Sequence, residues 1–422
     1  MNFRPNPLLY GAHEGFLSSF KLVVTMRDDV DHALLLDVVH SAMKRYPYFS
    51  VSPEKNGESI QLQFNPSPVP VFKDGRCVVL GSEECDGHLL AFGCEGKRLI
   101  LHASHYIADG MGICPLLMTV LYLYVSAKYG TDGLNSKRIS KPNDPISEAE
   151  YAYPFPEAPV LAEAFDSETR ETASKEVYSL DRSAFDDQGL YAYHLHIPQS
   201  AMMDVANPSD GSPVSFLSVM LFRALCSLDR ELAHPVVAHV QHQYRAAIKA
   251  PLNRHSLVSY LPVALSPAIK DRGVELQNTV MRGQILLGSE HEKDLRAVDR
   301  LVSVFERNHC ATLAEKQLAM RQYIENSIRH KTFGISYVGK MDWCGLDQYV
   351  EDLHAYIGEK NTPNMLLIEV MTVGEDFSIN FMQSGKGTRY VDAFIQQIQA
   401  FQIPIRLVGE ERYTLCNTKI PQ

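Results

Sequence analysis

The sequence predicts an α/β protein with mixed sheets, divided into two domains. Three observations support this prediction: strand-like runs occur in both halves, long apolar helices follow them, and a polar, proline-rich stretch separates the halves. A chain of 422 residues is also too long for a single hydrophobic core. We place the boundary in the proline- and acid-rich stretch, which gives an N-terminal lobe of residues 1–175 and a C-terminal lobe of residues 176–422.

The N-terminal half is expected to alternate strands with helices. Residues 16–26 are rich in apolar and β-branched side chains, which favours a strand. Asp31 and the two aspartates before it suit the N-terminus of the next helix, and that helix should end just before Pro47. Two further strands are expected from alternating or short apolar runs, at residues 59–64 and 89–92.

The C-terminal half mixes the same two kinds of element. Ser212 and Pro213 should open a long apolar helix, because serine caps helix N-termini and proline fits the first turn. Gly374 should lie in the turn of a hairpin between two strand-like runs. The other strands are expected at residues 191–197, 235–239, 257–265 and 333–339, and the other helices at residues 290–328 and 390–401.

Residues 98–130 carry the most informative pattern in the chain. The opening apolar run is typical of a buried strand, and the helix that follows is apolar on nearly every side. Between the two lie His105, Asp109 and Gly110, with the spacing H-x-x-x-D-G. Pro115 is expected in the first turn of the helix, where a missing N–H is tolerated.

This motif has a catalytic and a structural interpretation. A histidine held rigidly between a buried strand and a buried helix can act as a general base, because its pKa lies near neutrality. Alternatively, Asp109 is only the helix N-cap, Gly110 a turn residue and His105 a hydrogen-bonded core histidine. Chance matches to the pattern at this composition number on the order of 0.05, so coincidence is a weak explanation.

Composition excludes several classes of function. The net charge is −10 with no basic block, which argues against nucleic acid and anionic membrane as partners. No apolar run reaches 18 residues without a polar break, and the first residues lack secretory features, so neither a membrane span nor secretion is expected. The eight cysteines are scattered, which indicates free thiols in a reducing, cytoplasmic location.

No metal site is expected in the chain, and no cysteine nucleophile is expected at the motif. His102 and His105 lie three residues apart on a strand and would face opposite sides, so they cannot share a metal ion. Cys114 is interpreted as a small buried residue of the apolar helix.

Several segments together point to a family. Besides the H-x-x-x-D-G unit, these are residues 44–49, the pair Tyr244-Arg245 with residues 253–256, and the glycine-bearing strand at residues 333–339. Their order resembles the chloramphenicol acetyltransferase-like superfamily. That superfamily includes acyl-CoA-dependent acyltransferases, condensation domains of non-ribosomal peptide synthetases and bacterial alcohol acetyltransferase-like proteins, and the chain most resembles the last of these.

The resemblance implies a fold and a role for the histidine. Two similar α/β lobes would form a V with a central tunnel, and His105 would lie near the middle of that tunnel. Acyl donor and acceptor would enter from opposite sides, and His105 would take the proton of the attacking acceptor. Asp109 would be structural and pair with an arginine, for which Arg45 and Arg245 are both candidates.

The resemblance also implies roles for residues around the histidine. Gly110 would let the backbone pass close to ligand, and a hydroxyl from Ser336 or Tyr337 would steady the oxyanion of the tetrahedral intermediate. Two departures from the family pattern stand out. Ser104 replaces the first of two adjacent histidines found in many members, and residues 340–345 replace the D-F-G-W-G element in altered order.

We therefore expect an acyltransferase that moves an acyl group, acetyl among them, from acyl-CoA to a small-molecule alcohol or amine. Acyl-CoA would be a co-substrate, with no permanently bound cofactor. One alternative is a condensation-type enzyme that takes its thioester from a carrier protein. The other alternative is a non-catalytic binding protein that retains the fold.

Overall fold

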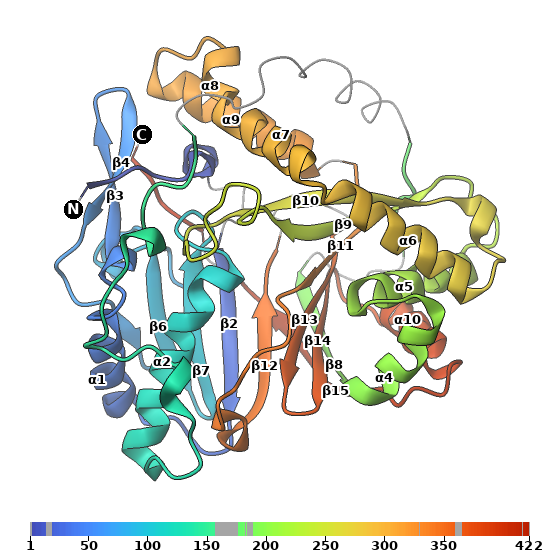
Figure 1. The fold of residues 1–422 in the computed structure, drawn as a ribbon, viewed down its shortest axis with the longest axis horizontal. Coiled ribbons are helices and arrows are strands. Elements are labelled where there is room, and N and C mark those ends of the chain that lie inside the picture. The colour runs from blue at the N-terminus through green and yellow to red at the C-terminus, as the bar shows by residue number, and fades with distance from the viewer. Residues whose placement is uncertain are drawn as a thin grey trace.

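The computed structural model describes residues 2–13, 19–156, 176–181, 183, 189–328, 330–358, 365–415 and 417–421. In Figure 1 the N-terminal strands and helices lie on the left, and most of the C-terminal half lies on the right. The α/β class predicted from the sequence is confirmed, because helices pack against mixed sheets in both parts. The expected strand at residues 16–26 is described only from Ser19, and the expected domain boundary falls at the end of residues 157–175, outside the described residues.

Within the described residues, the N-terminal part contains a five-stranded sheet, in the order β12-β2-β7-β6-β5, and a small three-stranded sheet, β1-β4-β3. The central strands β2 and β7 are buried along nearly their whole length and are mainly apolar, although Lys21 and His102 are buried with them. Their bounds are β1 (Asn2–Phe3), β2 (Ser19–Met26), β3 (Val51–Asn56), β4 (Ser59–Phe64), β5 (Val71–Phe72), β6 (Leu90–Glu95), β7 (Arg98–Ser104) and β12 (Val350–Tyr356).

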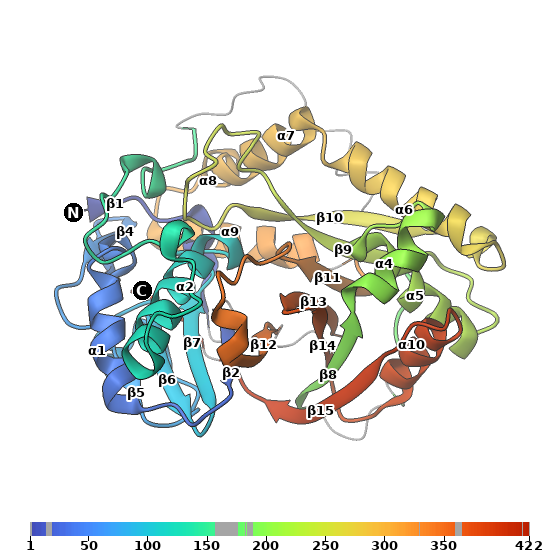
Figure 2. The same ribbon diagram turned by 60° about the horizontal axis from the view of Figure 1, so that its bottom comes forward.

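The C-terminal part is built on a seven-stranded sheet of described residues, in the order β10-β9-β11-β13-β14-β8-β15. The sheet is mixed, since β11 runs parallel to both of its neighbours while the other pairs are antiparallel. Figure 2 shows this sheet curving beside the N-terminal sheet. Its strands are β8 (Leu190–Pro198), β9 (Val236–Gln243), β10 (Val258–Leu265), β11 (Phe333–Tyr337), β13 (Leu366–Val373), β14 (Asp376–Ser384) and β15 (Arg406–Tyr413).

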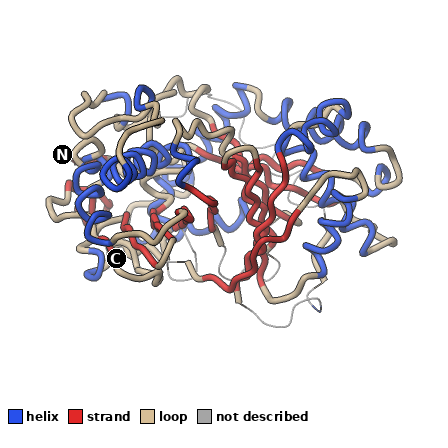
Figure 3. The backbone as a smooth tube through the Cα atoms, turned by 90° about the horizontal axis from the view of Figure 1, so that it is seen from below, coloured by secondary structure: helices blue, strands red, loops and turns tan. Residues whose placement is uncertain are grey.

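The helices flank the two sheets, as the blue tubes of Figure 3 show. α1 and α2 pack together on the N-terminal sheet, and α5 and α10 pack together on the C-terminal sheet. The helices are α1 (His32–Met43), α2 (Gly110–Tyr129), α4 (Gln199–Ala206), α5 (Pro213–Leu228), α6 (Val274–Gly288), α7 (His291–Val302), α8 (Val304–Arg307), α9 (Leu313–Ile328) and α10 (Arg389–Gln399).

One strand links the two parts of the fold. β12 comes late in the chain, between β11 and β13 of the C-terminal sheet, yet it pairs antiparallel with β2 at the edge of the N-terminal sheet. β12 also packs beside β13 and β14. The two sheets therefore meet along β12, and this junction places residues from both halves around the motif.

Most helix boundaries follow the sequence signals. Asp31 caps α1 by accepting hydrogen bonds from two backbone N–H groups, and Ser212 caps α5 with Pro213 in its first turn, so both expectations are confirmed. The placement of Pro115 is wrong. Because Asp109 is the N-cap, α2 begins at Gly110 and Pro115 lies in its second turn.

α2 is long and apolar enough to cross a membrane. Half of the apolar segment that meets this criterion is buried inside the protein. α4 and α5 meet the same test only when taken as one span, and they are bent by 84°. The expectation of no membrane span rested on unbroken apolar runs. The core position of α2 gives this helix an alternative reason to be apolar.

A buried ion pair holds the chain beyond α2 against the end of α1. Arg45 donates two hydrogen bonds to Glu150, at 2.8 and 2.9 Å, and Tyr48 donates a third at 2.8 Å. Arg45 is therefore engaged with Glu150, and Glu150 in turn lies in a short 3₁₀ helix that contacts the C-terminal lobe through its backbone carbonyl.

Replacing Glu150 tests how much this ion pair contributes to the stability of the fold. Glu150→Ala leaves the Arg45 guanidinium buried without its carboxylate, and we expect a loss of about 3–5 kcal/mol in the free energy of unfolding. Glu148→Ala, an exposed change in the same 3₁₀ helix, should leave stability within about 0.5 kcal/mol. Urea unfolding measures both, and equal effects would contradict the assignment.

Candidate active site

The turn between β7 and α2 is organised by Asp109. Its Oδ1 accepts a hydrogen bond from the Gly112 N–H at 2.7 Å, which caps α2. Oδ1 also accepts from Arg245 Nη2 at 2.8 Å, and Oδ2 accepts from the Leu257 N–H at 2.9 Å. Asp109 is 2 % exposed and Arg245 4 % exposed, so this pair is buried. Of the two arginines considered for Asp109, the structure pairs it with Arg245.

Arg245 fixes the loop between β9 and β10 as well. Its guanidinium donates to the carbonyls of Asn253 and His255, at 3.0 and 2.8 Å. Asn253 in turn donates to the carbonyl of Ala152 at 2.8 Å. The arginine and the segment at residues 253–256, singled out in the sequence, thus form one loop that clamps the motif from the opposite lobe.

Gly112 is the glycine that this clamp requires. A Cβ atom there would lie 2.1 Å from the Arg254 carbonyl oxygen, whereas a Cβ on Gly110 would meet only Val338 at 3.5 Å. Gly110 lines the cavity described below, and its closeness to a ligand stays a prediction. The sequence analysis did not single out Gly112, because its constraint comes from a segment distant in the chain.

His105 follows the last residue of β7 and is partly exposed. Its ring packs on Phe20, with 4.5 Å between ring centroids. Within the described part of the chain, no hydrogen bond ties the imidazole to another residue. Burial lowers the pKa of His105 to about 4, although the Asp109 carboxylate opposes this, so the ring is neutral at pH 7.

His105 faces a cavity of about 650 Å³, counting the solvent at its mouth. The enclosed part is much smaller, about 90 Å³, so most of this space is open to solvent at the mouth. The N-terminal sheet and α2 supply one wall, and β9, β10, β11 and β13 supply the other. The cavity is lined by, among others, His105, Gly110, Cys114, His242, Ser336, Tyr337, Ala355 and Glu369. The cavity thus lies between the lobes; a tunnel through the molecule stays a prediction.

Ser336 and Tyr337 both line this cavity, but their surroundings differ. The parallel pairing of β11 with β13 places Ser336 opposite Glu369, and the two side chains are hydrogen-bonded. The Tyr337 ring packs edge-on against Phe377, with 5.9 Å between centroids, and contributes to the C-terminal core. Ser336 is therefore the better-placed hydroxyl.

Glu369 is the main site residue that the sequence did not reveal. It is buried in the cavity wall, and burial raises its pKa to about 8 despite the hydrogen bond with Ser336, so it is mostly protonated at pH 7. In the sequence it is a single acid within the apolar run of β13. An acid at the centre of such a run was the available signal, because a strand buried on both faces has no solvent to receive a charge.

Two other ionisable residues, His242 and Cys114, line the cavity. His242 Nε2 lies 3.1 Å from Asp294 Oδ2, so its ring is already engaged with a carboxylate. Cys114 is partly exposed and lines the cavity, so the expectation of a buried residue is only partly met. Desolvation nonetheless raises the pKa of Cys114 to about 12, which keeps the thiol protonated.

The segment that replaces the D-F-G-W-G element is a structured turn. Trp343 is buried and donates a hydrogen bond from Nε1 to the Thr372 carbonyl at 2.7 Å. Gly345 has φ +85°, and a Cβ there would meet the Gly133 carbonyl at 2.3 Å, so this position requires glycine. The altered sequence order therefore still anchors the chain after β11 to β13.

No protein-family model matches the sequence, and a search of curated proteins finds no match. Solved structures are similar in fold. F. graminearum TRI101 complexed with coenzyme A and T-2 mycotoxin is 11% identical, with a TM-score of 0.59 and coverage of 95% of this chain and 97% of that chain. Polyketide synthase associated protein 5 from Mycobacterium tuberculosis is 12% identical, with a TM-score of 0.56 and coverage of 93% and 98%.

A third similar structure is the condensation domain of the monacolin K polyketide synthase MokA, at 9% identity, a TM-score of 0.57 and coverage of 93% and 94%. The chain therefore has the fold of these solved structures, which agrees with the α/β fold that the resemblance of its sequence motifs implied. At these identities the likeness establishes the fold alone.

The depressed pKa of His105 has a measurable consequence for stability. An unfolded histidine titrates near pH 6.5 and the folded His105 near 4, so between these values the unfolded state binds more protons. The contribution of His105 to folding stability therefore falls as the pH falls from about 6.5 to 4. His105→Gln removes this titration. Urea unfolding at pH 6.5 and 4.5 should therefore show a smaller loss in the free energy of unfolding for the variant than for the wild type. The exposed control His291→Gln should behave as the wild type does; equal losses of stability in all three proteins would contradict the lowered pKa of His105.

Proposed function

We propose that the protein is an acyltransferase, with His105 as general base, that moves an acyl group from a thioester to the hydroxyl or amine of a small molecule. The observation that carries this proposal is the neutral imidazole of His105, which makes no hydrogen bond with any described residue and faces a cavity between the lobes. The fold shared with coenzyme A complexes and with condensation domains supports a transferase role.

The reaction follows from the state of the imidazole. One ring nitrogen of His105 accepts the proton of the acceptor hydroxyl or amine as that group attacks the carbonyl carbon of the thioester. A new C–O or C–N bond forms, and the carbonyl π electrons move onto oxygen. When the intermediate collapses, the C–S bond breaks and the leaving sulfur takes the proton back from the imidazolium. A ring of low pKa holds that proton weakly, which favours handing it on.

Asp109 positions the base and does not touch the reactants in this scheme. Its two oxygens are occupied by Arg245, Gly112 and Leu257. Its negative charge still raises the proton affinity of His105 and so stabilises the transient imidazolium. The same residue therefore builds the turn and adjusts the base held by that turn.

Ser336 is proposed as a donor to the oxyanion. Because Glu369 is mostly protonated at pH 7, its hydroxyl can donate to Ser336 Oγ. The Ser336 O–H is then free to donate into the cavity, where the carbonyl oxygen gains charge. Tyr337 is the second candidate, with its ring held against the C-terminal core.

Acyl-CoA is the proposed donor. TRI101 structures of the same fold are complexed with coenzyme A, with T-2 or deoxynivalenol also present. A carrier-protein thioester is the alternative donor, favoured by the likeness to the MokA condensation domain. The free thiols of the described cysteines support the expectation of a reducing cytoplasmic location. A non-catalytic role is less favoured, because the cavity at His105 is open instead of filled by side chains.

Removing the base tests the central assignment. With acetyl-CoA and a panel of alcohols and amines, the wild type should release free thiol and acylated acceptor, and His105→Ala should reduce kcat by about 10²–10⁴-fold. His242→Gln, which replaces a neighbouring histidine already engaged by Asp294, should keep most of the activity. Unaltered turnover in His105→Ala would refute the role of His105. Turnover with an acyl-carrier protein but not with CoA would select the condensation-type alternative.

A second test concerns the oxyanion. Ser336→Ala should lower kcat by about 10²–10³-fold with little change in KM, because the lost hydrogen bond forms in the transition state. Tyr337→Phe, which removes only the hydroxyl, should have a small effect. The opposite ranking of the two variants would assign the oxyanion contact to Tyr337.

A further inference from the structure

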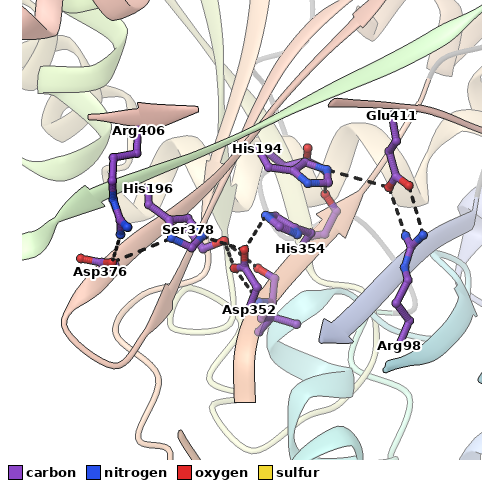
Figure 4. Close-up of polar contacts among 12 residues, drawn as sticks. Arg98, His194, His196, Asp352, His354, Asp376, Ser378, Arg406 and Glu411 are labelled. Atoms are coloured by element: carbon purple, nitrogen blue, oxygen red, sulfur yellow. Dashed lines mark hydrogen bonds and ion pairs between the residues drawn. The ribbon is translucent and has the colours of Figure 1, made fainter. Parts of the chain in front are cut away.

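A second group of histidines lies at the junction of the two sheets. His196 comes from β8, and Asp352 and His354 come from β12 (Figure 4). Side chains alternate along a strand, so Asp352 and His354 point away from the face on which Ala355 lines the cavity of His105. The group is therefore separate from the proposed active site.

The three side chains converge on one point. His196 Nε2 lies 2.7 Å from Asp352 Oδ2, and His354 Nε2 lies 3.3 Å from the same oxygen. All three ligand atoms lie within 4.8 Å of one another. A tetrahedral ion with bonds of about 2.0 Å keeps its ligand atoms about 3.3 Å apart, so small side-chain rotations would admit one.

His354 supplies an independent sign of a ligand. The residue is 4 % exposed, and its buried Nε2 makes no hydrogen bond with any described residue, although Asp352 Oδ2 lies 3.3 Å away. Buried polar atoms are rarely left unpaired, because desolvation without a hydrogen bond costs free energy. An imidazole binds a cation through the lone pair of an unprotonated ring nitrogen, and Nε2 is the His354 nitrogen that faces the cluster.

The surroundings orient the three ligands in the manner of a metal site. Asp352 Oδ1 accepts hydrogen bonds from the Ser378 hydroxyl at 2.5 Å and from the Leu353 N–H at 2.8 Å, which leaves Oδ2 for the cluster. On the far side of the His196 ring, Nδ1 lies 3.9 Å from Asp376 Oδ2. Carboxylates behind a ligating histidine are a common feature of metal sites, where they orient the ring.

We propose that His196, Asp352 and His354 bind a divalent transition-metal ion, with Zn²⁺ as the best match. Two imidazoles and one carboxylate suit Zn²⁺ and its neighbours, whereas Mg²⁺ and Ca²⁺ prefer oxygen ligands alone. His194 does not complete the set, because its ring stacks on His354 at 3.9 Å and its Nε2 is hydrogen-bonded to Tyr356. Water would fill the fourth position.

The ion would join the two sheets. β12 belongs to the N-terminal sheet and β8 to the C-terminal sheet, so a metal bridging His196 and His354 ties one to the other. Arg98 of β7 and Glu411 of β15 make a parallel link beside it, with two hydrogen bonds of 3.1 Å (Figure 4). The site would thus be structural, and it would stabilise the junction behind the cavity.

The test uses the full chain without a histidine tag, freed of metal by chelator and returned to buffer. Calorimetric titration with ZnCl₂ should show one equivalent bound, and the melting temperature should rise by a few degrees with Zn²⁺ and fall back with chelator. CoCl₂ should give the visible absorption bands of a low-symmetry site. These readouts are independent of acyl transfer, so they hold or fail separately from the proposed function.

Variants locate the ion. His196→Gln changes the partly exposed ligand at the edge of the cluster and should lower Zn²⁺ affinity at least roughly 100-fold, while Asp376→Asn should lower it roughly tenfold. His291→Gln, at an exposed histidine far from the cluster in sequence, should bind as the wild type does. Each metal-free variant, including His354→Gln at the buried ligand, is first checked for a cooperative thermal transition. If His354→Gln does not fold, the comparison of His196→Gln with the wild type decides the outcome. Absence of Zn²⁺ binding by the wild type, or wild-type affinity in His196→Gln, would overturn the proposal.

Discussion

The buried pair of Asp109 and Arg245 is the interaction on which the rest of the site depends. The carboxylate caps α2, accepts from the backbone of Leu257 and binds the arginine that holds the β9–β10 loop. A single side chain therefore fixes the turn that presents His105 and joins that turn to the opposite lobe. Because both partners are almost fully buried, either one alone would be an uncompensated charge, which makes the pair an all-or-none constraint.

The strand β12, at the junction of the lobes, also contributes to the site. β12 carries cavity-lining Ala355 on one face and the polar residues Asp352 and His354 on the other. The apolar face lines the cavity that His105 also lines, while the polar face contacts the C-terminal sheet through His196. The cavity wall on one side of the strand and the attachment of the lobes on the other thus depend on the same seven residues.

The elements with clear local signals were predictable. α1, α5 and β4 carry capping residues or alternating apolar residues, and their positions follow from these features. β12 was not predicted, because its buried polar side chains face the junction of the lobes. Charged residues at buried positions remove the apolar pattern by which a strand is recognised in the sequence. Pro115 was misplaced by one turn because the boundary of α2 is set by the hydrogen bonds of Asp109.

The sequence by itself determined the α/β class, the H-x-x-x-D-G turn between a buried strand and a buried helix, and the residue types suited to base catalysis. Those features depend on neighbours a few positions apart, so periodicity and spacing reveal them. Only the tertiary structure decided that Arg245, 136 positions away, is the partner of Asp109, and that Glu369 lies beside Ser336. It also brought His196 to Asp352 across the two sheets. Such contacts depend on how the sheets pack, and no local pattern of the chain encodes that packing.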